Sequence, residues 1–308
     1  MDERILITGG TGSFGRACVS RLLDNHNPKR VVIFSRDELK QYEMKQEFNN
    51  DRLRFFVGDV RDRDRLYRAF QGVNTVIHAA ALKQVPTAEY NPFEVVKTNI
   101  LGSQNIVEAA IDCGVKKVIA LSTDKACNPV NLYGATKLCM EKLFINGNAY
   151  AGGRENRTKF SVVRYGNVWG SRGSVVELFE KQKATGIITI TNPDMTRFWI
   201  KLPNAVSFVL SMLPIMRGGE VLVPKMESSY IHQVAQDVAP GCMVKVIGTR
   251  PGERLHEILI TEEEGKRTWD CGNFYTIEPE LDWWVRGKME GTTMVKVPTN
   301  FVYRSGGR

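Results

Sequence analysis

The segment Ser122–Lys137, with the sequence STDKACNPVNLYGATK, contains two pairs of side chains that could transfer protons. Tyr133 and Lys137 are four residues apart, so on a helix both side chains lie on one face. A phenol beside an ammonium loses its proton more easily, because the positive charge stabilises the phenolate. This pair predicts the acid/base chemistry of a dehydrogenase that works with a nicotinamide.

Asp124 and Lys125 form a second ionisable pair just before the first. The oxidation of a simple alcohol needs only Tyr133 and Lys137, so two more proton-transfer groups indicate that oxidation is one step of a longer reaction. The alternative is a solvated salt-bridging pair at the end of a strand. We favour the catalytic interpretation because ionisable groups beside a dehydrogenase motif are typical of a functional site.

A glycine-rich turn occupies residues 8–15, with the sequence TGGTGSFG and glycines spaced three apart. It follows an expected strand and begins an expected helix, so the backbone can approach a pyrophosphate held on the free amides of the helix N-terminus. Alone, such a turn could be only a tight strand–helix connection. Together with Tyr133 and Lys137 it predicts a dinucleotide site. The residues expected to contact the cofactor are Gly9, Thr11, Gly12, Ser13, Phe14, Gly15, Ser35, Arg36, Asp37, Glu38, Lys40, Asp59, Val60, Ala80, Tyr133 and Lys137.

The choice between NAD and NADP depends on the end of the second expected strand. An NAD site usually has a carboxylate there, about 20 residues past the glycines, which binds the ribose hydroxyls. Ser35 and Arg36 instead suit a 2′-phosphate, with Lys40 close behind them. Asp37 and Glu38 come slightly late and fit the first turn of the next helix, where carboxylates are favoured. We therefore predict NADP.

Asp59 follows the third expected strand and is placed to reach the adenine, although it could instead cap the next helix. The three alanines at residues 79–81 follow the fourth expected strand. We expect them to form a floor of small residues beneath the cofactor.

Short apolar runs alternate with helical patterns in the first half of the chain, and these elements must position the site. We expect strands at 5–7, 31–34, 53–57, 75–78, 118–122 and 161–164, and helices at about 14–23, up to about 48 and after 131–132. Strands that alternate with helices build a parallel sheet covered on both faces. The predicted fold class is therefore α/β, a Rossmann-type doubly wound parallel sheet, with an NADP-binding domain at 1–165.

Residues 166–308 have a looser pattern, because glycines and prolines such as Pro203 and Pro214 break it into short pieces. We expect mainly a smaller substrate-binding lobe, with the chain returning to the sheet near 221–223. From about Gly287 to the end the sequence predicts a poorly packed tail.

The composition is that of an ordinary soluble enzyme: 308 residues, 43% hydrophobic and 25% charged. No signal peptide and no run of about 18 apolar residues is visible, so we expect no membrane span and a cytoplasmic location. The six cysteines are scattered, which favours reduced thiols over disulfides or a metal site. The net charge of +8 suits an anionic small ligand better than nucleic acid, because the basic residues are dispersed.

The glycine turn and the Tyr133-x-x-x-Lys137 motif resemble the extended short-chain dehydrogenase/reductases. The chain is most similar to one branch, the inverting UDP-N-acetylglucosamine 4,6-dehydratases that open the pseudaminic acid pathway. The motifs that carry this resemblance between about Ile5 and Glu257 are SRDELKQ, FFVGDVRD, HAAALKQVP, STDKA-NPVNLYGATK, VVRYGNV-GSRGSV, MTRFWI and RPGERLHE.

The resemblance implies a role for each ionisable group in the segment. Tyr133 takes the proton from the sugar 4-hydroxyl, and Lys137 holds the nicotinamide ribose and lowers the Tyr133 pKa. Thr123 hydrogen-bonds the 4-oxygen. Lys125 is the base for the proton on carbon 5, provided that its pKa is lowered by burial or by its neighbours. Asp124 is the acid for the departing 6-hydroxyl. Retaining dehydratases have Asp-Glu at this pair, so Lys125 indicates inversion at carbon 5.

The resemblance also implies a set of contacts to the substrate, UDP-N-acetylglucosamine. Arginine suits phosphate because its fork is planar and permanently charged, although any single arginine could equally be a surface charge. The expected substrate-binding residues are Lys83, Asn167, Arg172, Arg197, Arg250 and Glu253. Phe198-Trp199 is expected in the core of the lobe, and Trp169 close to the nicotinamide edge.

Two other interpretations remain open. A retaining 4,6-dehydratase or a 4-epimerase of a UDP-sugar shares most of these motifs, and a 4-epimerase needs no base at carbon 5. A non-catalytic NADP-sensing protein is the second, although such proteins often lose the Tyr or Lys that this chain keeps. A homo-oligomer is expected by family analogy only.

Overall fold

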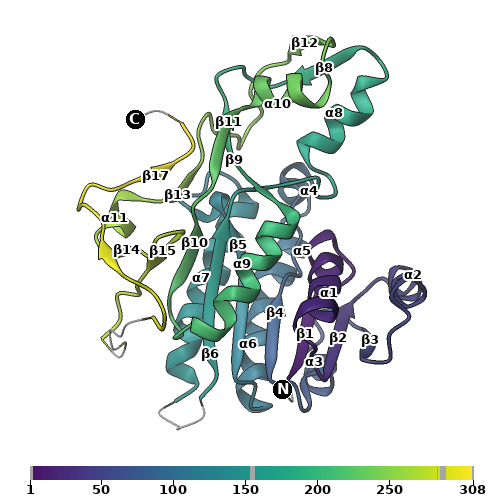
Figure 1. Cartoon of the computed structure of the whole chain (residues 1–308), viewed down its shortest axis with the longest axis vertical. Helices are drawn as coiled ribbons and strands as arrows, with labels where there is room; N and C mark the ends of the chain where they lie inside the picture. Colours follow the sequence, from purple (N-terminus) through teal and green to yellow (C-terminus); the bar gives the residue numbers. More distant parts are fainter. Residues whose placement is uncertain (1–2, 153–156, 283, 285–288, 307–308) are drawn as a thin grey trace.

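The computed structural model describes residues 3–152, 157–282, 284 and 289–306. Within these residues the centre of the protein is a ten-stranded sheet with the order β16-β14-β15-β10-β6-β5-β4-β1-β2-β3 (Figure 1). The parallel strands are β1 (Arg4–Thr8), β2 (Arg30–Ser35), β3 (Leu53–Val57), β4 (Thr75–His78), β5 (Lys117–Thr123), β6 (Lys159–Tyr165) and β10 (Val221–Pro224). The predicted doubly wound α/β fold is therefore confirmed, including the return to the sheet at 221–223.

Helices cover both faces of this sheet. The helical elements of the first half are α1 (Ser13–Asn25), α2 (Glu38–Phe48), α3 (Arg63–Phe70), α4 (Val85–Tyr90), α5 (Pro92–Val96), a π-helical stretch η1 (Lys97–Leu101), α6 (Gly102–Asp112), a 3-10 turn η2 (Asp124–Ala126) and α7 (Leu132–Tyr150). The apolar runs are continuous because both strand faces are buried. In β1, Leu6 belongs to the core beneath α3, α6 and α7, while Ile5 and Ile7 belong to the core beneath α1 and α9 (Leu202–Ile215).

A smaller lobe stands above the carboxyl ends of the parallel strands (Figure 1). Its elements are β7 (Asn167–Trp169), α8 (Val175–Lys183), β8 (Ile187–Ile190), β9 (Thr196–Lys201), β11 (Glu227–Tyr230), α10 (Ile231–Val238) and β12 (Met243–Val246). Strands β7, β9 and β11 form one small sheet, and β8 pairs with β12 in another. The lobe has a core of its own around Phe179, Ile188 and Val234.

The prolines of the second half interrupt it less than the sequence predicts. α9 runs unbroken from Leu202 to Ile215, with Pro203 in its first turn and Pro214 in its last. Proline is tolerated in the first turn because its missing N–H would have no partner there in any case. The expectation of short pieces is therefore wrong for this segment.

The C-terminal residues are packed against the protein, and the expectation of a poorly packed tail is wrong for those that the structure describes; residues 285–288 and 307–308 lie outside them. The last elements are β13 (Ile258–Ile260), α11 (Glu262–Gly265), β14 (Thr268–Asp270), β15 (Phe274–Ile277), β16 (Val295–Lys296) and β17 (Tyr303–Arg304). β16 extends the main sheet through β14, and β17 pairs with β13. Ser305 is buried, at 4% exposure.

Candidate active site

A cleft of about 1020 Å³ lies at the carboxyl ends of the parallel strands, where the sheet faces the lobe. Ligands of open α/β sheets bind at this edge, beside the point where the strand order reverses. Of the predicted cofactor and substrate residues, all but Glu38 line the cleft; of the predicted catalytic residues, all but Asp124 line it. Glu38 is the first residue of α2, and Asp124 is fully buried behind the cleft surface.

The glycine turn packs closely against the end of β4 and lines the cleft. Gly9 has a φ of 65°, and a Cβ there would lie 2.9 Å from the backbone nitrogen of Ala80. The N-cap of α1 is Gly12, which supplies no side-chain hydrogen bond to the free amides of the first turn. An anion is the natural partner for such amides. The turn therefore fits the pyrophosphate of a dinucleotide.

The end of β2 has the features predicted for it. Asp37 caps α2, since its carboxylate accepts from the backbone N–H of Lys40 at 3.0 Å, and Lys40 pairs with the same carboxylate. These bonds lower the pKa of Asp37. Arg36 is half exposed beside the cleft. Asp37 and Glu38 thus begin the helix, and Arg36 lines the cleft directly before it.

Asp59 does not cap a helix. The cap of α3 is Asp62, whose side chain accepts from the backbone of Arg65 at 2.9 Å. Asp59 instead accepts from Arg61 at 2.7 Å and lies 3.7 Å from Arg36. Partial burial opposes ionisation, but the bonds from Arg61 prevail and lower the Asp59 pKa. The alternative of a helix cap is therefore wrong, and the carboxylate lines the cleft.

The catalytic segment is folded tightly against helix α7. Asn131 caps this helix by accepting from the backbone of Gly134 at 2.8 Å. Gly134 has no room for a side chain, because a Cβ there would lie 2.1 Å from the carbonyl oxygen of Lys125. This close approach is what places Tyr133 beside the η2 turn that carries Asp124 and Lys125.

The Tyr133 phenol is not activated in the way that the sequence predicts. Burial raises its pKa to about 12, and the charge of Lys125 and a hydrogen bond with Thr123 only partly oppose this rise. Lys137 donates to the Leu121 carbonyl at 2.5 Å and contacts the Met140 sulfur at 2.9 Å. Burial lowers the pKa of Lys137 to about 8. In the protein alone, therefore, Lys125 and not Lys137 supplies the charge that favours the phenolate.

Lys125 and Asp124 are in direct contact, at 3.1 Å from Nζ to Oδ1. Burial alone would lower the Lys125 pKa, but the carboxylates of Asp124 and Glu257 prevail and raise it. The expectation that its surroundings lower the Lys125 pKa is therefore wrong for the protein alone. Asp124 also accepts from the Thr123 hydroxyl at 2.9 Å, while its Oδ2 is buried with no hydrogen-bond partner among the described residues.

Glu257 is a charged residue of the site that the sequence did not single out. Its side chain is 4% exposed, lines the cleft and lies 3.5 Å from Lys125 and 3.6 Å from Arg197. The only sequence signal is its place in RPGERLHE, four residues after Glu253. A carboxylate in a motif rich in arginine resembles a surface charge until the fold buries it.

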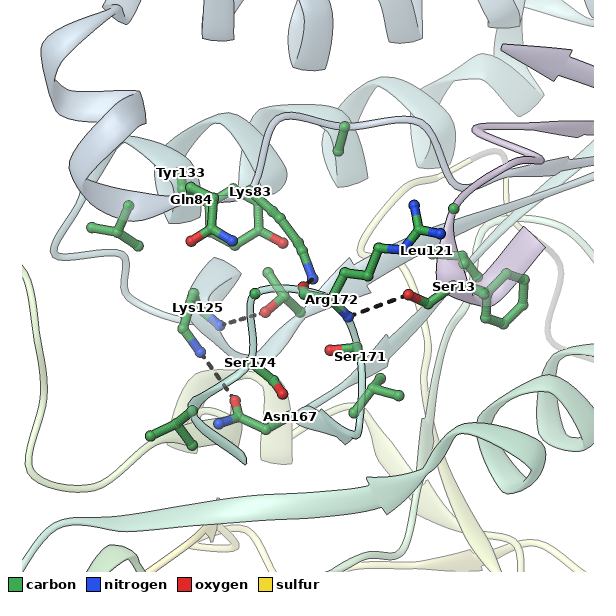
Figure 2. A pocket seen from close by; sticks show the side chains of 18 of the residues that line it. Ser13, Lys83, Gln84, Leu121, Lys125, Tyr133, Asn167, Ser171, Arg172 and Ser174 are labelled. Carbon is green, nitrogen blue, oxygen red and sulfur yellow. Dashed lines mark hydrogen bonds between the residues drawn. The ribbon is translucent and has the colours of Figure 1, made fainter. Parts of the chain in front are cut away.

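Lys83 and Arg172 both line the cleft, and Arg172 lies beside Ser13 of the glycine turn (Figure 2). The Lys83 ammonium donates to the carbonyl of Arg172 at 3.0 Å, and the Arg172 backbone donates to Ser13 in the glycine turn at 3.3 Å. Burial, followed by the charge of Lys125, lowers the Lys83 pKa. The loop that carries Arg172 therefore connects the lobe to the glycine turn.

Four further predicted substrate residues, Asn167, Arg197, Arg250 and Glu253, line the cleft. Asn167 accepts from Lys125 at 3.4 Å. Arg197 is 7% exposed and donates to the Thr196 carbonyl at 2.7 Å, so its guanidinium is held by the protein itself. Glu253 accepts from the Arg250 backbone at 3.1 Å in an exposed loop. The fold thus brings all four residues to the cleft, two of them arginines.

Trp169 does not lie at the nicotinamide edge. It is not among the residues that line the cleft, and it packs edge-to-face on Trp199 at 5.4 Å between ring centroids. Trp199 in turn packs on the lobe core, and Phe198 is 1% exposed. The expectation for Trp169 is therefore wrong. The expectation of a place in the lobe core is confirmed for Trp199, but Phe198 belongs to the core of the main sheet.

Comparison with known sequences identifies relatives along nearly the whole chain. The family described as "Polysaccharide biosynthesis protein" matches residues 5–279. The UDP-N-acetylglucosamine 4,6-dehydratase (inverting) of Campylobacter jejuni subsp. jejuni serotype O:23/36 (strain 81-176) is 54% identical over 281 residues, 91% of this chain and 84% of that protein. The UDP-glucose 4-epimerase of Rickettsia bellii (strain RML369-C) is 45% identical, over 90% of this chain and 83% of that protein.

Solved structures share the fold. Pen from Bacillus thuringiensis is 37% identical, with a TM-score of 0.89 over 99% of this chain and 93% of that one. DesIV, a dTDP-glucose 4,6-dehydratase from Streptomyces venezuelae solved with NAD and TYD bound, is 22% identical, with a TM-score of 0.73 over 82% and 86% of the two chains. The second likeness concerns the fold alone. In the described residues no helix is long and apolar enough to cross a bilayer.

Proposed function

The chain belongs to the polysaccharide biosynthesis protein family and, within it, to the branch of inverting UDP-N-acetylglucosamine 4,6-dehydratases, and from this we propose that it converts UDP-N-acetylglucosamine to UDP-2-acetamido-2,6-dideoxy-β-L-arabino-hexos-4-ulose. The observation that carries the proposal is the Asp124–Lys125 pair in contact beside Tyr133, at the bottom of a cleft large enough for a dinucleotide and a sugar nucleotide. A 4-epimerase has no need of such a pair.

The cofactor is a nicotinamide dinucleotide, and when bound it would supply a hydride acceptor and donor for the sugar. The residues of the chain that would hold it are the glycine turn, the end of β2 and Asp59, all of which line the cleft. The uncapped N-terminus of α1 supports this, because its free amides favour a pyrophosphate.

Tyr133 accepts the proton of the 4-hydroxyl as carbon 4 is oxidised. Burial holds the proton on the phenol of the ligand-free protein, so activation must come from charge near the bound substrate. Lys125 already provides part of this charge. Lys137 lies one turn after Tyr133 on α7, where it can hold the nicotinamide ribose. The ketone at carbon 4 then makes the proton on carbon 5 acidic.

Asp124 and Lys125 need one shared proton to eliminate water. In the ligand-free protein that proton sits on Lys125, because two carboxylates lie beside it. Elimination requires the opposite state, a neutral amine that removes the carbon 5 proton and a carboxylic acid that protonates the leaving 6-hydroxyl. Transfer along the 3.1 Å contact between the two side chains converts one state into the other without any proton from solvent.

The decisive experiment is proton NMR of the purified protein with UDP-N-acetylglucosamine in deuterated water. A new methyl group, with deuterium at carbon 5 in the L-arabino configuration, is the expected result. A product with an intact 6-hydroxyl would replace the proposal by a 4-epimerase, the activity named for the Rickettsia relative. The D-xylo configuration would leave dehydration standing but remove inversion.

NADP is our proposed form of the cofactor. Arg36 and Lys40 line the cleft at the end of β2, and Asp37 is occupied as a helix cap. A guanidinium in this position can bind a 2′-phosphate. Dissociation constants of both dinucleotides for the wild type and for Arg36→Ala test this. The variant should lose affinity for NADP by at least tenfold and keep its affinity for NAD.

We also propose a cytoplasmic homo-oligomer whose product enters pseudaminic acid synthesis. All six cysteines are free, which suits a reducing compartment. Sedimentation of the purified protein measures the oligomer. The pathway is tested by offering the product to an aminotransferase-type enzyme and measuring whether the 4-ketone is converted to an amine.

A further inference from the structure

Glu257 is a buried carboxylate in the wall of the cleft that the proposed mechanism leaves without a role. Its Oε1 lies 3.5 Å from Lys125 Nζ and 3.6 Å from Arg197 Nε. A carboxylate with a 4% exposed side chain is costly unless it is paired, and both of its partners are cations of the cleft. One of those partners is the proposed base for carbon 5.

We propose that Glu257 is a positioning residue for Lys125, which holds the ammonium in the cleft and keeps the shared proton on Lys125 until a substrate is bound. The proposal rests on the proposed function of the Asp124–Lys125 pair. Glu257 itself contacts no reacting atom and acts through Lys125.

The charged and titratable groups around Lys125 come from five parts of the chain. They are Asp124 in η2, Tyr133 in α7, Lys83 after β4, Arg197 in β9 and Glu257 before β13. Asp124 and Glu257 favour the ammonium, while Arg197 and Lys83 disfavour it. Without the Glu257 charge, one carboxylate faces two cations, and the surroundings favour the ammonium of Lys125 less strongly.

Ser305, directly after β17, fixes the position of Glu257. The Glu257 backbone donates to the Ser305 hydroxyl at 2.9 Å and accepts from the Ser305 backbone at 2.9 Å. The same hydroxyl reaches the carbonyl of Thr196 at 3.2 Å, in the strand that carries Arg197. The carboxylate and its second cation are therefore anchored to one buried serine, which supports a fixed rather than an incidental contact with Lys125.

The variant Glu257→Gln tests the proposal because it removes the charge and keeps the shape. The Lys125 side chain is 24% exposed, so it can be labelled with acetic anhydride and its peptide quantified by mass spectrometry across a pH series. This readout needs no turnover. The pH of half-labelling of Lys125 should fall by about 1 to 3 units in the variant, as expected for the loss of an opposite charge at this distance. The pH profile of dehydration should move in the same direction.

Two matched variants complete the test. Glu263→Gln removes a carboxylate that pairs with Lys266 on the surface, and the labelling of Lys125 should not change. Glu257→Asp keeps the charge but withdraws it by one methylene, so the pH of half-labelling of Lys125 should fall by less than in the Gln variant. The Asp variant also provides the test if the Gln variant does not fold. A Lys125 labelling curve that is identical in wild type, Gln and Asp variants would overturn the inference. A wild-type protein that dehydrates no UDP-sugar would overturn the proposed function. The labelling experiment would still test the contact between Glu257 and Lys125, because it needs no turnover.

Discussion

Lys125 and Lys137 lie in the same cleft, yet their surroundings shift their pKa values in opposite directions. Lys137 is buried with a carbonyl and a thioether as its partners, and burial lowers its pKa to about 8. Lys125 is also desolvated, but Asp124 and Glu257 lie within 3.5 Å of it and raise its pKa. Burial alone therefore does not decide the charge of a lysine; the nearest carboxylates do.

The opposite pKa shifts suit the two lysines to different roles in one site. A lysine of lowered pKa beside the Tyr133 helix is suited to hydrogen bonds with a ribose, and its charge can change near neutral pH. A lysine held as an ammonium between carboxylates stores the proton that elimination needs. The predictions below test whether the two lysines are as distinct as their surroundings indicate.

Tyr133→Phe is expected to have the largest effect, because it removes the group that accepts the proton of the 4-hydroxyl. Oxidation at carbon 4 should slow by about 10³-fold or more, and dehydration with it, since no ketone forms. The measurement is the formation of reduced nicotinamide in a single turnover with UDP-N-acetylglucosamine. Tyr150→Phe, an exposed tyrosine at the end of the same helix, is the control. Normal oxidation by Tyr133→Phe would contradict the role of the phenol.

Lys125→Ala is expected to impair dehydration far more than oxidation at carbon 4, whereas Tyr133→Phe impairs both steps. Dehydration should fall by about 10²-fold or more, because the base for carbon 5 is absent. Oxidation at carbon 4 should slow far less, so reduced nicotinamide should accumulate instead of passing through as a transient. Lys142→Ala, at an exposed position on α7, should leave both steps unchanged. Full dehydration by the Lys125 variant would place the base elsewhere.

The sequence predicted the elements around Tyr133 and Lys137 because their signals are local. The strands of the parallel sheet are continuous apolar runs, and the glycine turn and the Tyr-x-x-x-Lys spacing each lie within a few residues. Even the use of Asp37 as a helix cap follows from its place directly before a charged helix. Short-range patterns of this kind need no knowledge of the rest of the fold.

The surroundings of Lys125 could not be predicted in this way. Glu257 meets it across more than 100 positions of sequence, and Ser305 anchors Glu257 from a segment that the sequence suggested was poorly packed. β16 and β17 are two residues long, too short for a periodic pattern. The direction of the Lys125 pKa shift was wrong for the same reason, because it depends on a carboxylate that only the tertiary fold supplies.

Lys137→Met is expected to stabilise the protein while impairing catalysis. A pKa lowered from 10.5 to about 8 corresponds to a cost of ~3 kcal/mol at pH 7 for keeping the buried ammonium charged. Losing the hydrogen bond to the Leu121 carbonyl costs about 1 kcal/mol. The net gain in the free energy of unfolding should therefore be ~2 kcal/mol. Urea unfolding of the cofactor-free protein measures it.

The stability gain of Lys137→Met should decrease as the pH rises. The folded state binds the proton of Lys137 less tightly than the unfolded state, so the cost is present in full below pH 8. It shrinks as the pH rises from 8 and vanishes above 10.5. The difference in stability between Lys137→Met and wild type should therefore fall by more than half between pH 7 and about pH 9.5. A difference that is independent of pH would mean that Lys137 is not a buried, destabilising charge.

Ser305→Ala should have the smallest effect, and it tests the anchoring of the Lys125 surroundings. The variant leaves the buried N–H of Glu257 without its partner and removes one of two donors to the Thr196 carbonyl, which still accepts from Arg197, at a cost of about 1–2 kcal/mol in the free energy of unfolding. The backbone bond from Ser305 to the Glu257 carbonyl remains, so Glu257 should stay near Lys125 and kcat should fall by less than about tenfold. Ser211→Ala, an exposed position on α9, is the control for both measurements. If Ser305→Ala abolished dehydration while the protein stayed folded, the C-terminal strand would be part of the catalytic machinery and not only its support, and the contrast between the two lysines would then depend on the last residues of the chain.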